Sequence, residues 1–220
     1  MRRLAFVVFF ASLLAGCGDS DENRGRSLPA TATQTTAGSL AGLGSFTYKC
    51  ASPSDSFCSD NSLFGPGIPQ LAVGAEALLS FKTSNGEDRS VTISASPDRV
   101  RLDAGRVALL REGTAAVFAT ESGGEIVDGY NLVASTKSAT RLQALGGGLI
   151  GFRVFSVDRA GKVLAGSIPC TWTVDDPAVA VITTDPSSTV VLLDLKANGK
   201  TSLRVTYGDF KEVIPVEVNR

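Results

Sequence analysis

The sequence predicts an all-β protein, and three observations support this. Short valine- and threonine-rich segments alternate apolar with polar residues, and glycines and polar breaks separate them. Leucine and lysine do not recur at helical spacing. One pattern of strands and turns occurs twice along the chain. A chain of 220 residues has room for one large β-domain or two small ones.

The N-terminus has the organisation of an export signal. Arg2 and Arg3 precede the apolar run of residues 4–14. This run is shorter than the ~20 apolar residues that a membrane-spanning helix needs. We therefore expect residues 1–16 to be a cleaved signal peptide.

The segment Leu14-Ala15-Gly16-Cys17 follows this apolar run. It resembles the lipobox of bacterial lipoproteins at all four positions. The resemblance implies cleavage between Gly16 and Cys17, attachment of a diacylglyceryl group to the thiol of Cys17 as a thioether, and acyl chains of the palmitate class on the mature protein. Such chains anchor a protein in a membrane. Gly18, in the position where an aspartate would favour inner-membrane retention, favours the outer membrane. The alternative is an ordinary signal peptide followed by an unrelated cysteine.

Residues 17–45 change in composition towards Asp, Ser, Thr, Gly and Ala. They offer little apolar surface to offset the entropy of ordering. We expect a lipidated, flexible tether that ends near residue 45.

Three further cysteines follow in a compartment that export makes oxidising. Cys50 and Cys58 bracket a turn-rich loop, and we expect them to form a disulfide. A metal site is the alternative, but it would need two further close ligands. Cys170 is left over; strand alternation places it on the same face as Trp172 and Val174. We expect it to be a buried thiol rather than a reactive or intermolecular one.

An internal repeat relates residues 91–120 to residues 171–207. Each copy has a strand, a proline-containing corner, two shorter strands, a glycine turn and a long alternating strand. The corner prolines, Pro97 and Pro177, are 80 residues apart, and the glycines of the turns, Gly113 and Gly199, are 86 apart. The repeat predicts two β-domains in tandem, at residues 46–136 and 137–220.

Local signals define turns and an edge within these units. Asn198-Gly199 supplies the positive φ that entry into the long strand requires. Residues 158–162 separate two β-like runs and predict a hairpin turn. Pro215 in the last strand, residues 213–218, predicts that this strand lies at a sheet edge or bulge.

The second unit resembles the bacterial immunoglobulin-like domain of group two, found in intimin- and invasin-type adhesins and in surface lipoproteins. The matching features are Trp172 before a proline corner, Asn198-Gly199-x-Thr201, and the closing Val216-x-Val218. The likeness covers residues 138–219 well and residues 68–134 more loosely, because no tryptophan precedes Pro97. It implies two tandem immunoglobulin-like β-sandwiches, a fold used as a spacer, a stalk or a binding head.

The composition argues against two classes of function. The sequence contains no histidine, which excludes Ser–His–Asp triads, Cys–His dyads and histidine-ligated metal sites. Removal of residues 1–16 takes away two arginines, so 19 basic residues face 22 acidic ones and the net charge is −3. No basic surplus exists for nucleic acid.

Three motifs in the sequence have simpler explanations than a binding site. Residues 146–151 satisfy G-x-G-x-x-G, but a β-like segment follows, whereas a dinucleotide site needs a helix there. Asp175, Asp176 and Asp185 could serve calcium, yet aspartate before proline is ordinary turn chemistry. Outward-facing aromatics are few, and for Phe118 and Phe155 we expect core or interface packing rather than a carbohydrate platform.

We therefore expect a cell-envelope lipoprotein whose non-catalytic immunoglobulin-like domains act in structure, adhesion or protein binding. Its partners would be the membrane, through Cys17, and a protein or envelope polymer. We expect no cofactor and no metal. The alternative is a lipoprotein that binds a glycan or small molecule, which would show a concave pocket rimmed by aromatics. A histidine-free hydrolase ranks third and would need paired carboxylates across a cleft.

Overall fold

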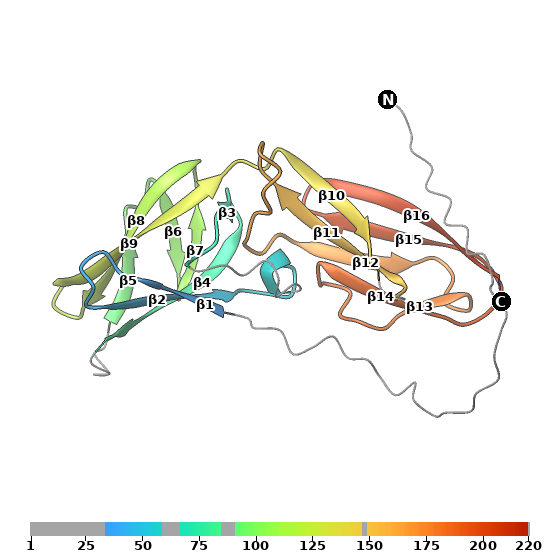
Figure 1. The fold of residues 1–220 in the computed structure, drawn as a ribbon, viewed down its shortest axis with the longest axis horizontal. Coiled ribbons are helices and arrows are strands. Elements are labelled where there is room, and N and C mark those ends of the chain that lie inside the picture. Colours follow the sequence, from blue (N-terminus) through green and yellow to red (C-terminus); the bar gives the residue numbers. More distant parts are fainter. Residues whose placement is uncertain (1–33, 59–66, 85–90, 147–148, 220) are drawn as a thin grey trace.

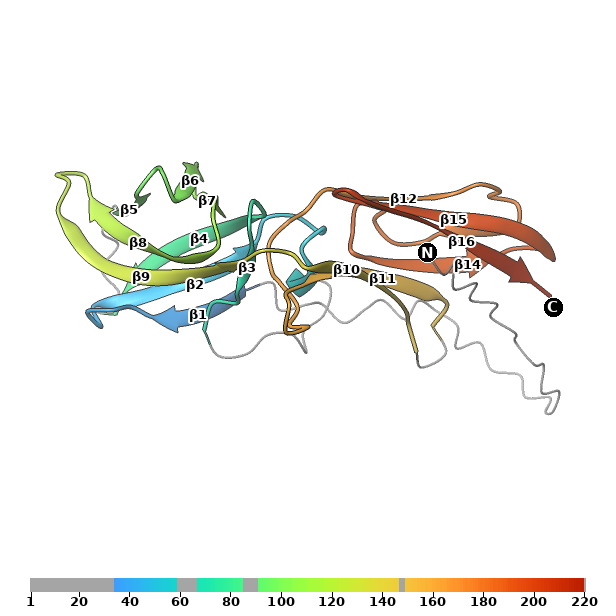
Figure 2. The same cartoon turned by 90° about the horizontal axis from the view of Figure 1, so that it is seen from above.

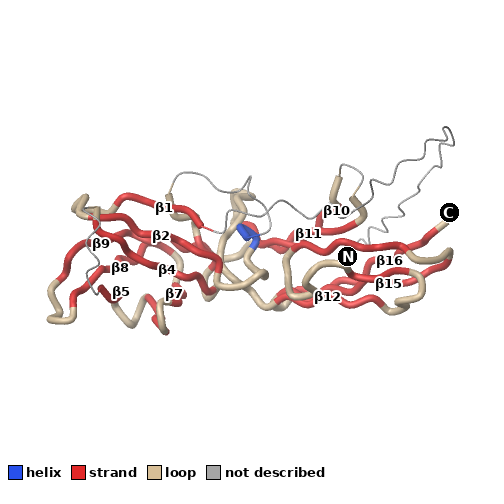
Figure 3. Tube along the Cα trace, turned by 90° about the horizontal axis from the view of Figure 1, so that it is seen from below, coloured by secondary structure: helices blue, strands red, loops and turns tan. Residues whose placement is uncertain are grey.

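The computed structural model describes residues 34–58, 67–84, 91–146 and 149–219. Their regular structure consists of sixteen strands and one short 3-10 helix, η1 (Ser56–Cys58). The prediction of an all-β fold is confirmed. The strands form two groups that lie end to end in an elongated molecule, and η1 lies between them (Figure 1, Figure 3).

The N-terminal group contains two sheets. The first has the spatial order β1-β2-β4-β7-β6. Its strands are β1 (Gln34–Gly38), β2 (Gly44–Cys50), β4 (Glu76–Thr83), β7 (Arg106–Leu109) and β6 (Val100–Asp103). The second has the order β3-β9-β8-β5. Its strands are β3 (Leu71–Ala72), β9 (Ile126–Ser135), β8 (Gly113–Glu121) and β5 (Val91–Ala95).

The C-terminal group also contains two sheets. One has the order β10-β11-β14-β13. Its strands are β10 (Ala139–Ala144), β11 (Gly151–Val157), β14 (Val190–Leu195) and β13 (Ala180–Ile182). The other has the order β12-β15-β16. Its strands are β12 (Cys170–Val174), β15 (Gly199–Tyr207) and β16 (Phe210–Val218).

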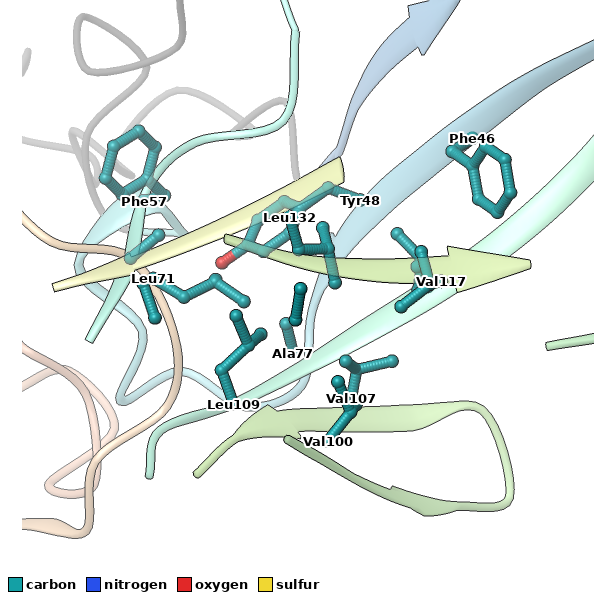
Figure 4. Packing of buried hydrophobic residues seen from close by; sticks show 14 of the residues in the cluster. Phe46, Tyr48, Phe57, Leu71, Ala77, Val100, Val107, Leu109, Val117 and Leu132 are labelled. Atoms are coloured by element: carbon teal, nitrogen blue, oxygen red, sulfur yellow. The ribbon is translucent and has the colours of Figure 1, made fainter. Parts of the chain in front are cut away.

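Each group has its own hydrophobic core between its sheets, as expected when alternating strands bury one face. The N-terminal core centres on Phe46, Tyr48, Val117 and Leu132, which come from facing sheets (Figure 4). The C-terminal core centres on Trp172, which is 1% exposed, with residues of β11, β14 and β15 around it. Figure 2 shows the same end-to-end arrangement of the two groups from above.

The sequence repeat is confirmed at the level of strand pairing. β5 pairs with β8 and β6 with β7 in the first copy, and β12 pairs with β15 and β13 with β14 in the second. The proline corners are closed in the same way. Val100 donates its backbone N–H to the carbonyl of Ser96 at 3.0 Å, and Ala180 donates to that of Asp176 at 3.3 Å.

The local predictions in the second copy are also confirmed. Gly199 begins β15 with a φ of 156°. Asp158 donates its N–H to the carbonyl of Lys162 at 3.0 Å and closes the predicted turn. Pro215 lies in β16, which pairs with β15 alone and is therefore an edge strand. Proline has no N–H to offer a ladder, so an edge accommodates it.

The prediction of a flexible tether through residue 45 is wrong for its last part. Residues 34–38 form β1, which pairs with β2 in antiparallel register from Gln34↔Lys49 to Gly38↔Ser45. The composition of this segment does not predict a strand, because the segment has few apolar residues. Its order comes instead from hydrogen bonds to the neighbouring strand β2. The rest of the predicted tether lies outside the described residues, as does the signal peptide.

A buried carboxylate fixes the turn between β1 and β2. Asp128 at the start of β9 accepts hydrogen bonds from Ser39 Oγ (2.5 Å), Ala41 N (2.8 Å), Leu43 N (2.9 Å) and its neighbour Gly129 N (2.7 Å). Burial alone would raise the pKa of Asp128, but these hydrogen bonds outweigh it and hold the pKa below its usual value. The hairpin is therefore an integral part of the N-terminal fold.

Candidate functional site

The loop closed by the predicted disulfide lies at the junction of the two groups of sheets. Cys50 ends β2 and Cys58 ends η1, and their sulfur atoms are bonded with the Cα atoms 5.8 Å apart. The predicted disulfide is confirmed. Inside the loop, Asp55 donates its N–H to the carbonyl of Ser52 at 3.1 Å, and Cys58 donates to that of Asp55 at 2.9 Å. These turns direct the Asp55 side chain inwards.

Asp55 is fully buried, with 0% of its surface exposed. One carboxylate oxygen accepts the phenolic hydrogen of Tyr48, and the other accepts the backbone N–H of Phe57 at 3.0 Å. Burial raises the pKa of Asp55, although the hydrogen bonds from Tyr48 and from the amides of Phe57 and Gly166 act in the opposite direction. Burial and the charge of Asp55 raise the pKa of Tyr48 well above its ordinary value.

The same loop joins the two groups through the backbone. Asp55 forms an antiparallel bridge with Ser167, and Thr189 at the start of the β14 segment donates its N–H to the carbonyl of Pro53 at 3.1 Å. Beside it, Ala72 of β3 donates to the carbonyl of Ala165 at 2.9 Å. Backbone pairs of this kind fix orientation as well as distance, because both partners belong to ordered elements.

Three buried hydroxyls complete the junction. Tyr207 of β15 lies beside Ser56 of η1 and Ser156 of β11, and none of the three hydroxyls has a partner in full hydrogen-bond geometry among the described residues. Burial raises the pKa of Tyr207. Figure 4 shows the hydroxyl of Tyr48 on the side of the core where Leu71 and Phe57 lie. Polar side chains from both groups therefore meet in one buried cluster.

The chemistry open to this cluster is limited by its burial. Tyr48, Asp55 and Tyr207 are each 0% exposed, so a dissolved substrate cannot reach them. Burial raises the pKa values of the Asp55 carboxyl and of the two phenols and so disfavours their charged forms; these groups serve mainly as hydrogen-bonding groups. The arrangement supports a clamp between the two groups of sheets.

Cys170 is buried in β12, with Trp172 on the same face, as its alternation predicts. Its thiol donates a hydrogen bond to the carbonyl of Ser188 at 3.3 Å. Burial raises the pKa of Cys170 to about 12. The thiolate, which is the nucleophilic form, is therefore scarce at neutral pH. The prediction of a buried, unreactive thiol agrees with this environment.

The three aspartates that could serve calcium do not form a cluster among the described residues. Asp175 forms a two-pronged ion pair with Arg204, with both N–O distances 2.7 Å. Asp176 accepts the N–H of Ala178 at 2.9 Å, and Asp185 accepts that of Ser187 at 2.8 Å. In the described part of the chain, the one group of three ligand-type side chains close enough for a metal is Cys50, Asp55 and Cys58.

The glycine-rich motif and the aromatics also match their simpler explanations. Residues 147–148 of the glycine-rich motif lie outside the described residues. The motif leads into the strand β11, where a dinucleotide site would need a helix. Phe155 is 8% exposed and packs under the guanidinium of Arg153, 4.9 Å from the ring centre. Phe118 is half-buried, close to Gly129.

Cys17, the predicted lipid attachment site, and the Gly16–Cys17 cleavage site lie outside the described residues. None of the described residues belongs to a helix with the length and hydropathy that crossing a bilayer requires. The anchoring of the chain stays a prediction from the sequence.

Sequence reasoning missed the residues that matter most at the junction. Asp55 belongs to the turn-rich loop between Cys50 and Cys58, but its burial follows from the docking of that loop against β11 and residues 165–167. Tyr48 and Tyr207 lie at alternating core positions of β2 and β15, which predicts burial without predicting that both lie near Asp55. Only the repeat hinted that two β-units would need a junction.

No family model matches the chain, and no curated protein matches it. Among solved structures it is similar to domains 4 and 5 of the S-layer protein SbsC, at 17% identity and a TM-score of 0.32 over 69% of this chain and 94% of that one. It is also similar to a β-glucuronidase of Parabacteroides merdae, at 11% identity and a TM-score of 0.30 over 68% of this chain and 23% of the enzyme. Likenesses at these TM-scores do not bear on function.

Proposed function

We propose that this chain is a non-catalytic lipoprotein of the bacterial cell envelope. It is anchored through Cys17 and made of two immunoglobulin-like domains, residues 34–136 and 137–220, that form a rod of fixed shape. The rod holds a contact surface for a protein or an envelope polymer at a set distance from the anchor. The first domain begins earlier than the sequence predicted because β1 belongs to its sheet.

The observation that carries this proposal is the buried junction. Domains joined by exposed, polar linkers move relative to each other by default. Here Asp55, Tyr48 and Tyr207 are buried between the two groups, and backbone pairs join Asp55 to Ser167 and Ala72 to Ala165. A bend at this point would break these backbone pairs and leave buried N–H and C=O groups without partners, which costs about 1–3 kcal/mol for each group. The junction therefore favours one shape, as a spacer or display element requires.

The environments of the titratable groups support a non-catalytic role. Catalytic sites gather groups with shifted pKa values in an accessible cleft. Among the described residues, the groups with shifted pKa values are either buried, as Asp55 and Cys170 are, or paired with a neighbouring side chain, as Asp175 is with Arg204. The chain has no histidine to act as a general base near neutral pH.

Anchoring rests on Leu14-Ala15-Gly16-Cys17 and on the apolar run before it. The test is expression with the native leader in a bacterial host that has an outer membrane, in medium containing labelled palmitate. We expect wild type and the control Cys170→Ala to carry label and fractionate with the outer membrane, and Cys17→Ala to carry none. Unlabelled wild type with an intact leader would contradict anchoring.

The non-catalytic part of the proposal needs its own assay. A soluble chain should begin at Gly18, which removes the lipid-bearing cysteine and retains β1. We expect this chain to bind an envelope component without turning over a panel of glycans and peptides. Turnover that survives purification would contradict the proposal, and saturable binding of one small glycan would favour a glycan-binding lipoprotein instead.

A further inference from the structure

The disulfide loop holds three metal-ligand side chains in one place. The Sγ atoms of Cys50 and Cys58 and a carboxylate oxygen of Asp55 all lie within 4.8 Å of one another. In the structure the two sulfurs are bonded to each other, so neither is a thiolate. Reduction of that bond would leave two thiols beside a buried carboxylate.

We propose that, once the Cys50–Cys58 disulfide is reduced, the two thiolates and the Asp55 carboxylate form a site for a soft divalent metal ion of the zinc class. The loop then has two alternative covalent states, a disulfide and a metal thiolate. This site does not require lipidation of Cys17.

The geometry suits such an ion. Zinc takes thiolate at about 2.3 Å and carboxylate at about 2.0–2.2 Å in a tetrahedral arrangement, which places ligand atoms about 3.5–3.8 Å apart. The sulfurs need to separate by about 1.5–1.8 Å from their bonded distance of about 2 Å, and the carboxylate oxygen needs to approach by about 1 Å, which loop side chains can do. Thiolates select soft ions over calcium or magnesium. Both cysteines are half-buried, which leaves an approach from solvent for the ion and for a fourth ligand.

The surroundings of Asp55 supply a second observation. Among the described residues no cation pairs with it; the groups that face it from β2, from η1 and from the segment before β12 are the Tyr48 hydroxyl and the amides of Phe57 and Gly166. A buried carboxylate usually has a charged partner or a metal. Hydrogen bonds from Tyr48 and Phe57 to its two oxygens are the kind of support that orients metal ligands.

The reaction balances with a dithiol reductant. The dithiol gives two electrons and two protons to the Cys50–Cys58 bond and becomes a disulfide itself, leaving two protein thiols. Binding of the ion then displaces both thiol protons, and the proton on Asp55 if one is present, to solvent. The metal therefore draws the equilibrium towards the reduced loop.

Cobalt(II) is the probe, because thiolate ligation gives it charge-transfer absorption that carboxylate ligation does not. The chain from Gly18 onwards is reduced with a dithiol, freed of reductant without air, and titrated. We expect one ion per chain with thiolate charge-transfer bands, and zinc should displace it. The oxidised chain and Cys50→Ser/Cys58→Ser should show no such bands, and Cys170→Ser should behave as wild type.

Two further variants separate ligation from loop structure. Asp55→Asn retains the size and one acceptor oxygen for the Phe57 amide, and its amide nitrogen can donate to the Tyr48 hydroxyl, but it loses the charge. We expect it to weaken cobalt affinity by more than 100-fold. Tyr48→Phe removes only the supporting hydroxyl and should weaken it about 10–100-fold. Wild-type bands no stronger than those of Cys50→Ser/Cys58→Ser, or equal affinity in Asp55→Asn, would overturn the site.

Circular dichroism covers the case in which reduction disturbs the fold. Recovery of the native spectrum on addition of zinc supports the site. A reduced chain that stays unfolded and binds cobalt without the native spectrum overturns it, because the three ligands then do not come from a formed loop.

Discussion

Tyr48 donates its phenolic hydrogen to the buried carboxylate of Asp55, seven residues along the chain. Tyr48 belongs to the core of the N-terminal sheets, whereas Asp55 belongs to the loop that meets Ser167 of the C-terminal group. One hydrogen bond thus ties the core of one group to the junction with the other. The disulfide at Cys50 and Cys58 closes the short path between them.

Removal of the Tyr48 hydroxyl should lower the stability of the protein, whereas removal of the Tyr207 hydroxyl should not. We expect Tyr48→Phe to lower the free energy of unfolding by about 1–3 kcal/mol, because Asp55 loses a donor in a buried site. Tyr207→Phe is the matched control; its hydroxyl has no well-placed partner among the described residues, so we expect a change below about 0.5 kcal/mol. Chemical denaturation measures both, and equal losses would contradict this assignment.

The stability of the protein should respond to pH through Asp55. The folded-state pKa of Asp55 is raised, so its protonated form is favoured in the folded chain. Its contribution to stability is full below its unfolded-state pKa of about 3.9 and declines as pH rises through the folded-state pKa. Asp55→Asn cannot ionise and should escape this decline.

The measurement is the difference in unfolding free energy between Asp55→Asn and wild type, taken from pH 3 to pH 8. Taking the difference cancels the contributions of the other carboxylates to the pH dependence of the unfolding free energy. We expect Asp55→Asn to gain on wild type as the pH rises above about 4 and then to reach a plateau. A difference that stays flat, or that moves the other way, would show that Asp55 is ionised and well stabilised in the folded chain.

Cys170 should be inert in the folded protein. Its pKa of about 12 and its burial leave little thiolate at pH 8. We expect a thiol reagent to label no residue of the native, unreduced mature chain without Cys17, and one residue after unfolding in denaturant. Mass spectrometry of the labelled peptides identifies the site. Rapid labelling of Cys170 in the native chain would mean that β12 opens or that the thiol is accessible.

A strained turn offers a test of the fold in the N-terminal group. Ala104, between β6 and β7, has a φ of 45° and precedes Gly105, so both central residues of this hairpin turn are left-handed. Alanine pays about 1 kcal/mol or more there, whereas asparagine tolerates the conformation. We expect Ala104→Asn to stabilise the protein by about 0.5–1 kcal/mol. Ala160→Asn, in the turn after Asp158, is the control and should change little.

The sequence predicted features that depend on neighbouring residues better than features that depend on contacts between residues far apart in the chain. Alternation in residues 199–207, the Pro215 edge and the Gly199 turn are local signals, and each predicted what the structure contains. The Cys50–Cys58 bond was predictable because a short loop closes easily. β1 was missed because its residues carry little apolar pattern. Its order depends on pairing with β2 and on the turn that follows it, where Ser39 contacts Asp128, 89 residues further along the chain.

The candidate site was harder to predict for the same reason. The residues 48, 55, 165–167 and 207 come from four segments, and their meeting depends on how the two groups dock. No local pattern marks an aspartate in a turn as buried, since most aspartates in turns face solvent. The repeat indicated two units but carried no information about the surface between them.

The central claim is that the two groups of sheets keep one relative orientation. Spin labels on Thr92→Cys and Glu212→Cys report the relative position of the two groups, because both residues are exposed and each group carries one of them. Labelling requires neither reduction of the disulfide nor reaction of the buried Cys170. Pulsed electron resonance on the chain from Gly18 onwards, with Cys170→Ser as background, gives the distribution of distances between the labels. We predict a single narrow distribution that broadens in Tyr48→Phe. A broad or two-peaked distribution in the otherwise unchanged chain would contradict the rod.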